Sequence, residues 1–400
     1  MSDSAVAGVR GDDVRSDCWV RVEENHAPII QIESKVAALY GDSIRATVAS
    51  TLAALDATDL AVTLLDRGAL PYTLMARVEA AVKRLRPHIS HVCLPDVNPA
   101  TGYPSARHRL RRTRLYLPGN TPKFFINAGL HKPDAVILDL EDSVAPEEKD
   151  AAQILVRNAL RVVNFYGAEK MVRVNPLPRG LDDARMLIPH GVHTFLIPKV
   201  EEADHVRAID RLINESDREI FLIPIIESAR GVVRAFEIAR ASPRIVALAM
   251  GLEDYTRDIG AERTAEGQES LWARSQIVNA ARAAGVTPLG SVFSAVADEK
   301  GLYAFARAAR TLGFEGIGCL HPRQVRIAHA AFAPTPEEIE QACRIALAFK
   351  QARALGLGVV ALNGKMIDAP VVERAYHTIR LARALECLPV EWEPRVRDVQ

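Results

Sequence analysis

The 400-residue sequence has only five cysteines, and they are scattered: Cys18, Cys93, Cys319, Cys343 and Cys387. No pair has the CxxC spacing of a zinc or redox motif, so neither a disulfide framework nor a zinc site is indicated. A net charge is also absent, because 50 Lys and Arg balance 50 Asp and Glu. Without a basic excess, nucleic acid and anionic membranes are not expected partners.

Long apolar runs are missing as well. No stretch approaches the roughly 20 apolar residues that a membrane helix needs. The N-terminal stretch MSDSAVAGVRGDD has no apolar core of a signal peptide, so a cytoplasmic location is expected. With 48% hydrophobic and 25% charged residues, the composition is that of a globular protein. The length predicts more than one domain, or one large α/β domain with an appendage.

The first part of the chain predicts a small α/β domain over residues 1–87. Residues 1–15 are small and polar and are expected to be mobile, so that structure begins near Ser16. Strands are expected at CWVRVE, IIQIES and LAVTLLDRG, and helices at KVAALYGDSIRATVASTLAAL and PYTLMARVEAAVKRL. The stretch 88–107 is rich in Pro, Gly and polar residues without a sustained period, which predicts a linker.

Residues 108–400 repeat a buried strand followed by a helix. Eight strands are expected, at LYLPGN, AVILDLED, MVRVNP, TFLIPKV, EIFLIPIIES, RIVALAMGLED, TPLGSVFS and GIGCLHP. A helix is expected through TPKFFINAGLHK after the first strand, and others after the later strands. Eight such units in about 210 residues predict a (β/α)8 TIM barrel. The absence of GxGxxG after the first strand disfavours the open doubly wound sheet. A long helix and a proline-interrupted helical tail are expected to follow the barrel.

Acidic residues end two of these apolar strands. EIFLIPIIES delivers Glu227, and RIVALAMGLED delivers Glu253 and Asp254. A buried carboxylate must be paired, hydrogen-bonded or metal-bound, and Mg²⁺ is often held by one or two carboxylates together with water and substrate. We therefore expect a magnesium site, with ion-paired structural acids as the alternative. Since neighbouring strand residues face opposite ways, only one of Glu253 and Asp254 is expected to face the metal, and we choose Asp254.

Arg173 alternates with Val172 and Val174 in MVRVNP. An arginine within a buried strand is rarely unpaired. It is therefore expected to neutralise a neighbouring acid or to bind a substrate carboxylate or carbonyl.

Residues 112 to about 385 resemble the citrate lyase beta subunit and the wider HpcH/HpaI aldolase/citrate lyase family. The stretches that carry the resemblance are, in order, RTRLYLPGN, AVILDLEDSVAPEEKDAA, VRVNP, LIPIIESARGV, MGLEDYTRDIG, LGFEGIGCLHPRQV and GKMIDAP. The resemblance implies a TIM-barrel lyase that breaks a carbon–carbon bond in a 3-hydroxyacyl thioester. It also implies a homo-oligomer, a trimer or larger.

Roles for individual residues are implied by the same resemblance. Glu227 and Asp254 are implied as magnesium ligands, and Arg173 as the group that binds the 2-oxo acid portion of the substrate. Glu141 and Asp142 are implied as acids that hold water on the metal and that hold Arg173 in place.

Two further residues are implied to act at the thioester end. Arg112 is similar to the arginine that precedes the first barrel strand and contacts substrate or thioester phosphates. Asp368, in GKMIDAP, is implied to close the active site of a neighbouring subunit and to act as acid or base at the enolate carbon. From the residues alone, Asp368 is equally a cap for the helix that begins at Ala-Pro.

Residues 16 to 85 resemble the citrate lyase gamma subunit, which is the acyl carrier protein of that complex. YGDSIRATVASTLAAL and LDRGALPYTLMARVEAAV carry this resemblance. It implies a phosphoribosyl-dephospho-coenzyme A arm on a serine close before the first strand. Ser16 is the serine in a comparable position, although its spacing to the strand differs from the family's. The alternative is a domain that has lost the arm and aids assembly.

Two positions depart from the family pattern, because Ser291 lies in GSVFS where many members have Asp, and Ile317 stands where Lys is common. Recognition of the thioester is therefore expected to differ. The leading function is magnesium-dependent cleavage of a citryl thioester to oxaloacetate and an acetyl thioester, with an acyl transferase partner that loads the carrier. The alternatives are a lyase for free coenzyme A thioesters such as malyl- or citramalyl-CoA, and a non-catalytic carrier or assembly subunit.

Overall fold

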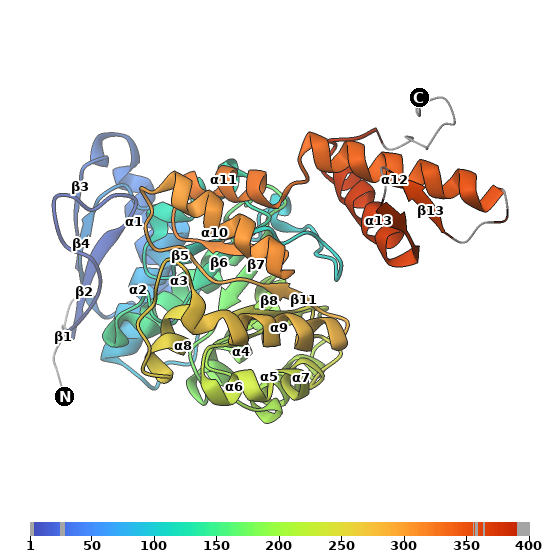
Figure 1. Ribbon diagram of the computed structural model, residues 1–400. Coiled ribbons are helices and arrows are strands. Elements are labelled where there is room, and N and C mark those ends of the chain that lie inside the picture. The colour runs from blue at the N-terminus through green and yellow to red at the C-terminus, as the bar shows by residue number, and fades with distance from the viewer. Residues whose placement is uncertain (1–3, 25–28, 355, 357–358, 363–364, 390–400) are drawn as a thin grey trace. The chain divides into compact units, whose positions relative to one another are not determined.

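A computed structural model describes residues 4–24, 29–354, 356, 359–362 and 365–389 (Figure 1). The chain divides into two compact units, residues 1–328 and 329–400. The first unit contains a small N-terminal domain and an α/β barrel, and the second is a helical unit. Within the described residues, no helix is both long and apolar enough to cross a membrane.

The N-terminal domain is a four-stranded sheet in the order β1-β2-β4-β3, with two helices. Its elements are β1 (Ser4–Gly8), β2 (Cys18–Glu23), β3 (Ile30–Ser34), α1 (Ala37–Ala54), β4 (Ala61–Asp66) and α2 (Pro71–Leu85). The strands and helices predicted after Ser16 are confirmed. The prediction that structure begins only near Ser16 is wrong, because β1 pairs antiparallel with β2 and buries Ala7. A five-residue edge strand of small side chains carries too little apolar pattern to be recognised.

The barrel is a sheet of eight parallel strands in the order β11-β10-β9-β8-β7-β6-β5-β12. A parallel bridge between Val292 and Gly318 links its two outer strands, so the sheet nearly closes. The strands are β5 (Thr113–Pro118), β6 (Ala135–Asp139), β7 (Glu169–Arg173), β8 (Thr194–Ile197), β9 (Phe221–Ile226), β10 (Ala247–Met250), β11 (Thr287–Leu289) and β12 (Ile317–Cys319). Aliphatic side chains such as Ile137, Ile223 and Leu289 fill its interior. The predicted (β/α)8 barrel is confirmed.

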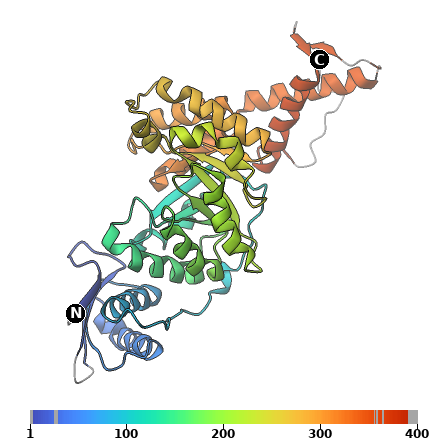
Figure 2. The same cartoon turned by 90° about the horizontal axis from the view of Figure 1, so that it is seen from below.

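Helices surround the barrel strands, as Figures 1 and 2 show. They are α3 (Lys149–Val162), α4 (Arg179–Leu187), α5 (Ala203–Asn214), α6 (Ala229–Val233), α7 (Ala235–Ala239), α8 (Leu252–Asp258), α9 (Leu271–Ala283), α10 (Glu299–Leu312) and α11 (Pro322–Phe332). In α5 the buried residues Val206, Ile209 and Ile213 recur at three- and four-residue steps, which is the pattern of a helix packed on a sheet.

One predicted barrel helix is absent from the structure. TPKFFINAGLHK forms two short 3₁₀ turns, Pro122–Phe124 and Ala128–His131. Gly129 approaches the backbone of Phe165 so closely that a Cβ atom would lie 2.5 Å from the Phe165 carbonyl oxygen. This packing holds the segment against the barrel in short turns, and a continuous helix does not form.

The second unit contains α12 (Pro336–Ala354), β13 (Val360–Leu362), β14 (Lys365–Ile367) and α13 (Ala369–Ala384). The predicted long helix corresponds to α12, and it packs on α13 through an apolar cluster that includes Ile345, Val372 and Ile379. The residues before Asp368 were predicted as helix. Their described parts form β13 and β14 instead, and α13 begins only where Pro370 supplies a helix start.

Ion pairs join the N-terminal domain to the barrel, and one of them is buried. Arg157 of α3 donates to both carboxylate oxygens of Glu79 on α2, at 3.0 and 2.7 Å, and both side chains are buried. Arg84 pairs with Asp150 at 2.6 Å. The two domains therefore pack within one compact unit, and the domain boundaries inferred from the sequence stay a prediction.

A second link reaches the end of a barrel strand. Arg77 of α2 donates to both oxygens of Asp17, at 3.0 and 2.8 Å, and to the backbone carbonyl of Asn120, at 2.7 Å. Asn120 follows β5, and Asp17 follows Ser16. This link places the Ser16 turn on the side of the domain that meets the carboxyl end of β5.

Candidate active site

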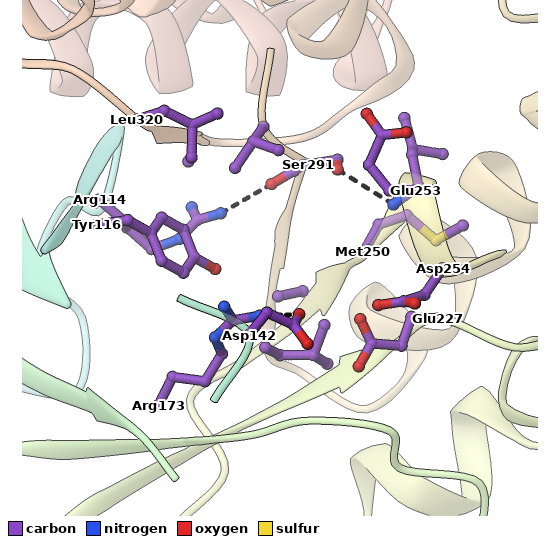
Figure 3. Close-up of a pocket in the computed structure, with 17 residues that line it drawn as sticks. Arg114, Tyr116, Asp142, Arg173, Glu227, Met250, Glu253, Asp254, Ser291 and Leu320 are labelled. Carbon is purple, nitrogen blue, oxygen red and sulfur yellow. Dashed lines mark hydrogen bonds and ion pairs between the residues drawn. The ribbon is translucent and has the colours of Figure 1, made fainter. Parts of the chain in front are cut away.

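A cavity of about 180 Å³ lies at the carboxyl ends of the barrel strands (Figure 3). This is the end at which TIM barrels carry their functional groups. Its charged and polar lining comes from six strands or the loops after them: Arg114, Tyr116, Asp142, Arg173, Glu227, Glu253, Asp254 and Ser291. The remaining wall is apolar or glycine.

Glu227 follows β9 and is 5% exposed. Its Oε1 accepts a hydrogen bond from the Lys199 backbone N–H at 2.6 Å. Its Oε2 faces Gly251, where a Cβ atom would overlap the carboxylate, so glycine is required there. Burial, together with the charges of Glu141 and Asp254, raises the pKa of Glu227 to about 8. A cation at this wall would relieve the repulsion among the three acids.

Asp254 lies beside Glu227 and faces the same cavity (Figure 3). It also forms an ion pair with Arg257 at 2.5 Å. The strand assignment that we used to choose between Glu253 and Asp254 is wrong, because β10 ends at Met250 and both acids lie in the first turn of α8. Glu253 is half exposed and forms an ion pair with Arg263. For this reason we keep Asp254, and not Glu253, as the candidate metal ligand.

Arg173 ends β7 and is held by acids on β6 and in the loop that follows. Its Nε and Nη2 donate to the two oxygens of Asp139, at 2.6 and 2.8 Å. Its Nη1 lies 2.7 Å from Glu141 and donates to Asp142 at 3.2 Å. Burial alone would lower the pKa of Arg173, but the hydrogen bonds and charge of Asp139 outweigh burial and raise it. The guanidinium therefore stays charged.

Glu141 is buried between two cations. Its oxygens lie 2.7 Å from Arg173 Nη1 and 2.8 Å from Lys199 Nζ, although no donor is aligned with them for a hydrogen bond. Burial raises the pKa of Glu141. Asp142 is more exposed and lies near the same two cations. Both acids therefore adjoin Arg173, as the family resemblance implied, and their catalytic roles stay a prediction.

Two arginines near the start of β5 occupy different places. Arg112 donates its backbone N–H and its guanidinium to Asp134, at 2.7 to 3.0 Å, and it is not part of the cavity lining. Arg114, which the sequence analysis did not single out, lines the cavity. Its Nη2 donates to the backbone carbonyl of Gly290 at 2.7 Å. Burial lowers the pKa of Arg114.

The two residues that depart from the family pattern, Ser291 and Ile317, lie after β11 and in β12. Ser291 lines the cavity, and its hydroxyl accepts a hydrogen bond from the Leu252 N–H at 3.1 Å. Ile317 is fully buried in β12.

Ser16 is not among the residues that line this cavity, and Asp368 belongs to the second unit. Ser16 is half-buried in the turn between β1 and β2, so it precedes the second strand of its domain, and its N–H donates to the Arg67 carbonyl at 3.0 Å. Asp368 is the N-cap of α13, where its side chain accepts a hydrogen bond from the Val371 N–H at 3.2 Å. The predicted cap is confirmed, and the predicted catalytic role stays a prediction.

The acids of the cavity fit a magnesium ion that keeps open positions. Within the described part of the chain, no three His, Cys, Asp or Glu side chains form a ready-made metal cage. Glu227 and Asp254 supply oxygens only, which suits Mg²⁺ held by two carboxylates with water and substrate.

The comparison with known families decides the classification. Residues 112–322 match the family model described as HpcH/HpaI aldolase/citrate lyase. The chain belongs to this family. Residues 2–85 match a second family model, described as malonate decarboxylase delta subunit (MdcD), of the acyl carrier protein type. The N-terminal domain is therefore acyl-carrier-like.

Individual members of the HpcH/HpaI aldolase/citrate lyase family cover most of the chain. Citrate lyase subunit beta of Leuconostoc mesenteroides subsp. cremoris is 39% identical over 285 residues, which is 69% of this chain and 94% of that protein. Mitochondrial citramalyl-CoA lyase of Rattus norvegicus is 30% identical over 332 residues, which is 78% of this chain and 96% of that protein. Because these relatives are lyases and match over two thirds or more of the chain, the chain is a carbon–carbon lyase.

A solved structure of a family member supports the fold. The CitE protein of Mycobacterium tuberculosis, in complex with magnesium, acetoacetate and coenzyme A, is 31% identical and superposes with a TM-score of 0.59. The match covers 69% of this chain and 99% of that chain.

Proposed function

We propose that this lyase cleaves a 3-hydroxyacyl thioester by magnesium-dependent retro-Claisen chemistry, with a citryl thioester as substrate and oxaloacetate and an acetyl thioester as products. The observation that carries the proposal is the joint placement of Glu227, Asp254 and Arg173 around one cavity at the barrel mouth. Citrate lyase beta subunits among the relatives, and magnesium in the M. tuberculosis CitE complex, support it.

Glu227 and Asp254 are the residues that would hold magnesium. When bound there, magnesium supplies Lewis-acid polarisation of the substrate's hydroxyl and carboxylate oxygens. The raised pKa of Glu227 fits this role, because a carboxylate crowded by two others is stabilised in its ionised form by a nearby cation.

Arg173 would bind the part of the substrate that becomes the 2-oxo acid. Its Nε and Nη2 donate to Asp139, and its Nη1 donates to Asp142 and lies 2.7 Å from Glu141, so the second N–H of Nη2 is left for a substrate oxygen. The centre of the Tyr116 ring lies 5.2 Å from the guanidinium carbon, and the Arg173 side chain is 13% exposed. Donors fixed in place before the reaction stabilise developing charge most strongly where water is excluded.

Carbon–carbon cleavage leaves an electron pair on the departing acetyl thioester. The substrate hydroxyl gives up its proton to solvent, its oxygen becomes the new carbonyl, and the carbon–carbon bond breaks to give the thioester enolate. The enolate carbon then takes a proton. We assign that transfer to Asp368 of a neighbouring subunit in a homo-oligomer, in keeping with acid–base roles of carboxyl groups.

Two thioester carriers are compatible with the chain. One is an arm on Ser16 in cis, loaded by an acyl transferase partner; the link from Asp17 through Arg77 to Asn120 would keep that turn near the end of β5. The other is free coenzyme A, whose phosphates Arg112 would contact. Citramalyl-CoA lyase of Rattus norvegicus and the coenzyme A of the CitE complex favour this second candidate.

Intact mass separates the two carriers. A mass increment that disappears in Ser16→Ala supports the arm, whereas an active enzyme of unmodified mass rules the arm out.

Calorimetric titration tests the metal site. Glu227→Gln and Asp254→Asn should each weaken Mg²⁺ binding at least ~10-fold, as expected when one of two carboxylate ligands is lost. Glu253→Gln, which alters the neighbouring acid, is the matched control. Unchanged binding in both ligand variants would refute the site.

A further inference from the structure

Arg114 is a buried arginine without an acidic partner. It is 2% exposed, and its guanidinium donates to the backbone carbonyls of Gly290, at 2.7 Å, and Arg111, at 3.4 Å. Within the described part of the chain, its Nε has no hydrogen-bond partner. Among the residues that the structure describes, no carboxylate lies within ion-pair distance of it. Two neutral carbonyls do not compensate a buried charge, which costs several kcal/mol when it is left unpaired.

The side chain of Arg114 belongs to the wall opposite the acids. In the barrel, β8, β7 and β6 lie between β9 and β5 on one side, and β10, β11 and β12 lie between them on the other. The strand that carries Arg114 therefore lies across the barrel from β9, the strand that Glu227 follows. Figure 3 shows Arg114 and Tyr116 on one side of the cavity, and Glu227 and Asp254 on the other.

The cavity between these walls has the size of a small acid. Its volume of about 180 Å³ is several times the ~30 Å³ that one water molecule occupies in the liquid. Gly290 and Gly318 also line the cavity. A Cβ atom at Gly318 would lie 2.6 Å from the Val292 side chain and 3.0 Å from the Tyr116 ring, so this wall has no room for a larger residue. The acid portion of an acyl thioester fits this space, and the coenzyme portion would lie outside it.

We propose that Arg114 binds a second carboxylate of the substrate, so that the cavity selects thioesters whose 2-oxo acid product is a dicarboxylate. The inference rests on the proposed lyase function. The first carboxylate and the adjoining oxygen face Glu227, Asp254 and Arg173. The second carboxylate supplies the negative charge that Arg114 lacks, through charge-assisted hydrogen bonds.

The proposed role of Arg114 favours citryl thioesters over citramalyl and malyl thioesters. Cleavage of a citryl thioester yields oxaloacetate, which has two carboxylates. Cleavage of citramalyl and malyl thioesters yields pyruvate and glyoxylate, which have one. A substrate with a single carboxylate would leave the Arg114 charge buried and unpaired, and specificity of this kind is large because the site's own polar group loses its partner.

Binding of the products tests the assignment without catalysis. The magnesium-loaded protein is titrated calorimetrically with oxaloacetate and with pyruvate. Wild type should bind oxaloacetate at least ~10-fold more tightly. Arg114→Met should weaken oxaloacetate binding ~10- to 100-fold, which corresponds to one charge-assisted interaction, and pyruvate binding much less. Replacing a buried charge by an apolar side chain of similar length is compatible with folding, and thermal unfolding checks this. Arg207→Met, an exposed arginine of α5, is the control.

Equal weakening for both acids, or no preference in wild type, would overturn the role of Arg114. Cleavage assays separate this failure from failure of the proposed function. If wild type cleaves citryl-CoA and citramalyl-CoA with equal kcat/KM, the lyase stands and Arg114 is not a specificity residue. If neither thioester is cleaved but oxaloacetate is preferred through Arg114, the site binds a dicarboxylate and the proposed reaction is wrong.

Discussion

Asp139 fixes Arg173 with both of its carboxylate oxygens, which accept from Nε at 2.6 Å and from Nη2 at 2.8 Å. The N–H of Glu141 and the hydroxyl of Ser143 hold Asp139 in turn. Burial alone would raise the pKa of Asp139, but Arg173 outweighs it and holds the pKa below its usual range. The pair is therefore a charged, oriented unit at the edge of the cavity.

Asp139→Asn should lower kcat/KM of the lyase reaction about 100-fold, because a guanidinium held by one oxygen is less well oriented for substrate and small misplacements cost on that scale. Steady-state kinetics measures the loss. Asp182→Asn, at an exposed acid paired with Arg185, is the control. Activity equal to that of the control would show that Asp139 is not needed to position Arg173.

Asp368 offers a substitution that separates capping from catalysis. Asn is as good an N-cap as Asp, so Asp368→Asn should keep the melting temperature while it lowers kcat ~10²- to 10⁴-fold, the usual contribution of an acid–base group. Asp368→Ala should lose both the helix cap and the acid–base group, and its free energy of unfolding should fall by about 1 kcal/mol. Full activity in Asp368→Asn would reduce Asp368 to a cap.

Replacing one partner of the Glu79–Arg157 pair should destabilise the protein more than replacing both partners. Glu79→Gln should lower the free energy of unfolding by about 3–5 kcal/mol, because it leaves the buried Arg157 without its partner. The double variant Glu79→Gln, Arg157→Met should recover part of that loss. Urea unfolding measures both. A single-variant cost as small as that of breaking the exposed Arg207–Asp204 pair would contradict the buried assignment.

His193 should make the protein less stable in acid. Its Nδ1 accepts from the Lys170 N–H and its Nε2 contacts the Tyr103 carbonyl, and burial with the Lys170 charge lowers its pKa to about 4. The unfolded chain binds this proton near pH 6.5, so the contribution is complete above pH 6.5 and is lost as the pH falls towards 4. The loss is at most about 3 kcal/mol. His193→Gln should reduce the change in the free energy of unfolding between pH 6.5 and pH 4, measured by urea unfolding. An unchanged pH dependence would refute this contribution of His193.

The barrel could be predicted because its strands are short apolar runs with polar ends. Glu227 and Arg173 were found for the same reason, since a charged residue in or beside a buried strand requires a partner. Arg114 in TRLYLP obeys the same rule, but it lies near the beginning of its strand, whereas functional groups of a TIM barrel are expected at the carboxyl ends of the strands. Asp139 in AVILD was not predicted, because Glu141 and Asp142 follow it within three residues and the sequence does not tell which acid pairs with Arg173.

Other features depend on tertiary contacts that no local pattern reveals. Gly251 approaches Glu227 so closely that only glycine fits there, and α8 starts at the next residue, Leu252, so that Asp254 lies in a helix and not in a strand. The strand β1 exists only because β2 offers it a pairing edge. The charged interface of Glu79 with Arg157 joins helices that are far apart in the sequence.

Cleavage of citryl-CoA in the presence and absence of magnesium tests the central claim most directly. Wild type should release oxaloacetate with Mg²⁺ and stop when EDTA removes it, while Glu227→Gln and Asp254→Asn should lose at least ~100-fold in kcat/KM, the scale of several kcal/mol of lost charge stabilisation. Oxaloacetate release that is indifferent to EDTA and to both substitutions would contradict the account.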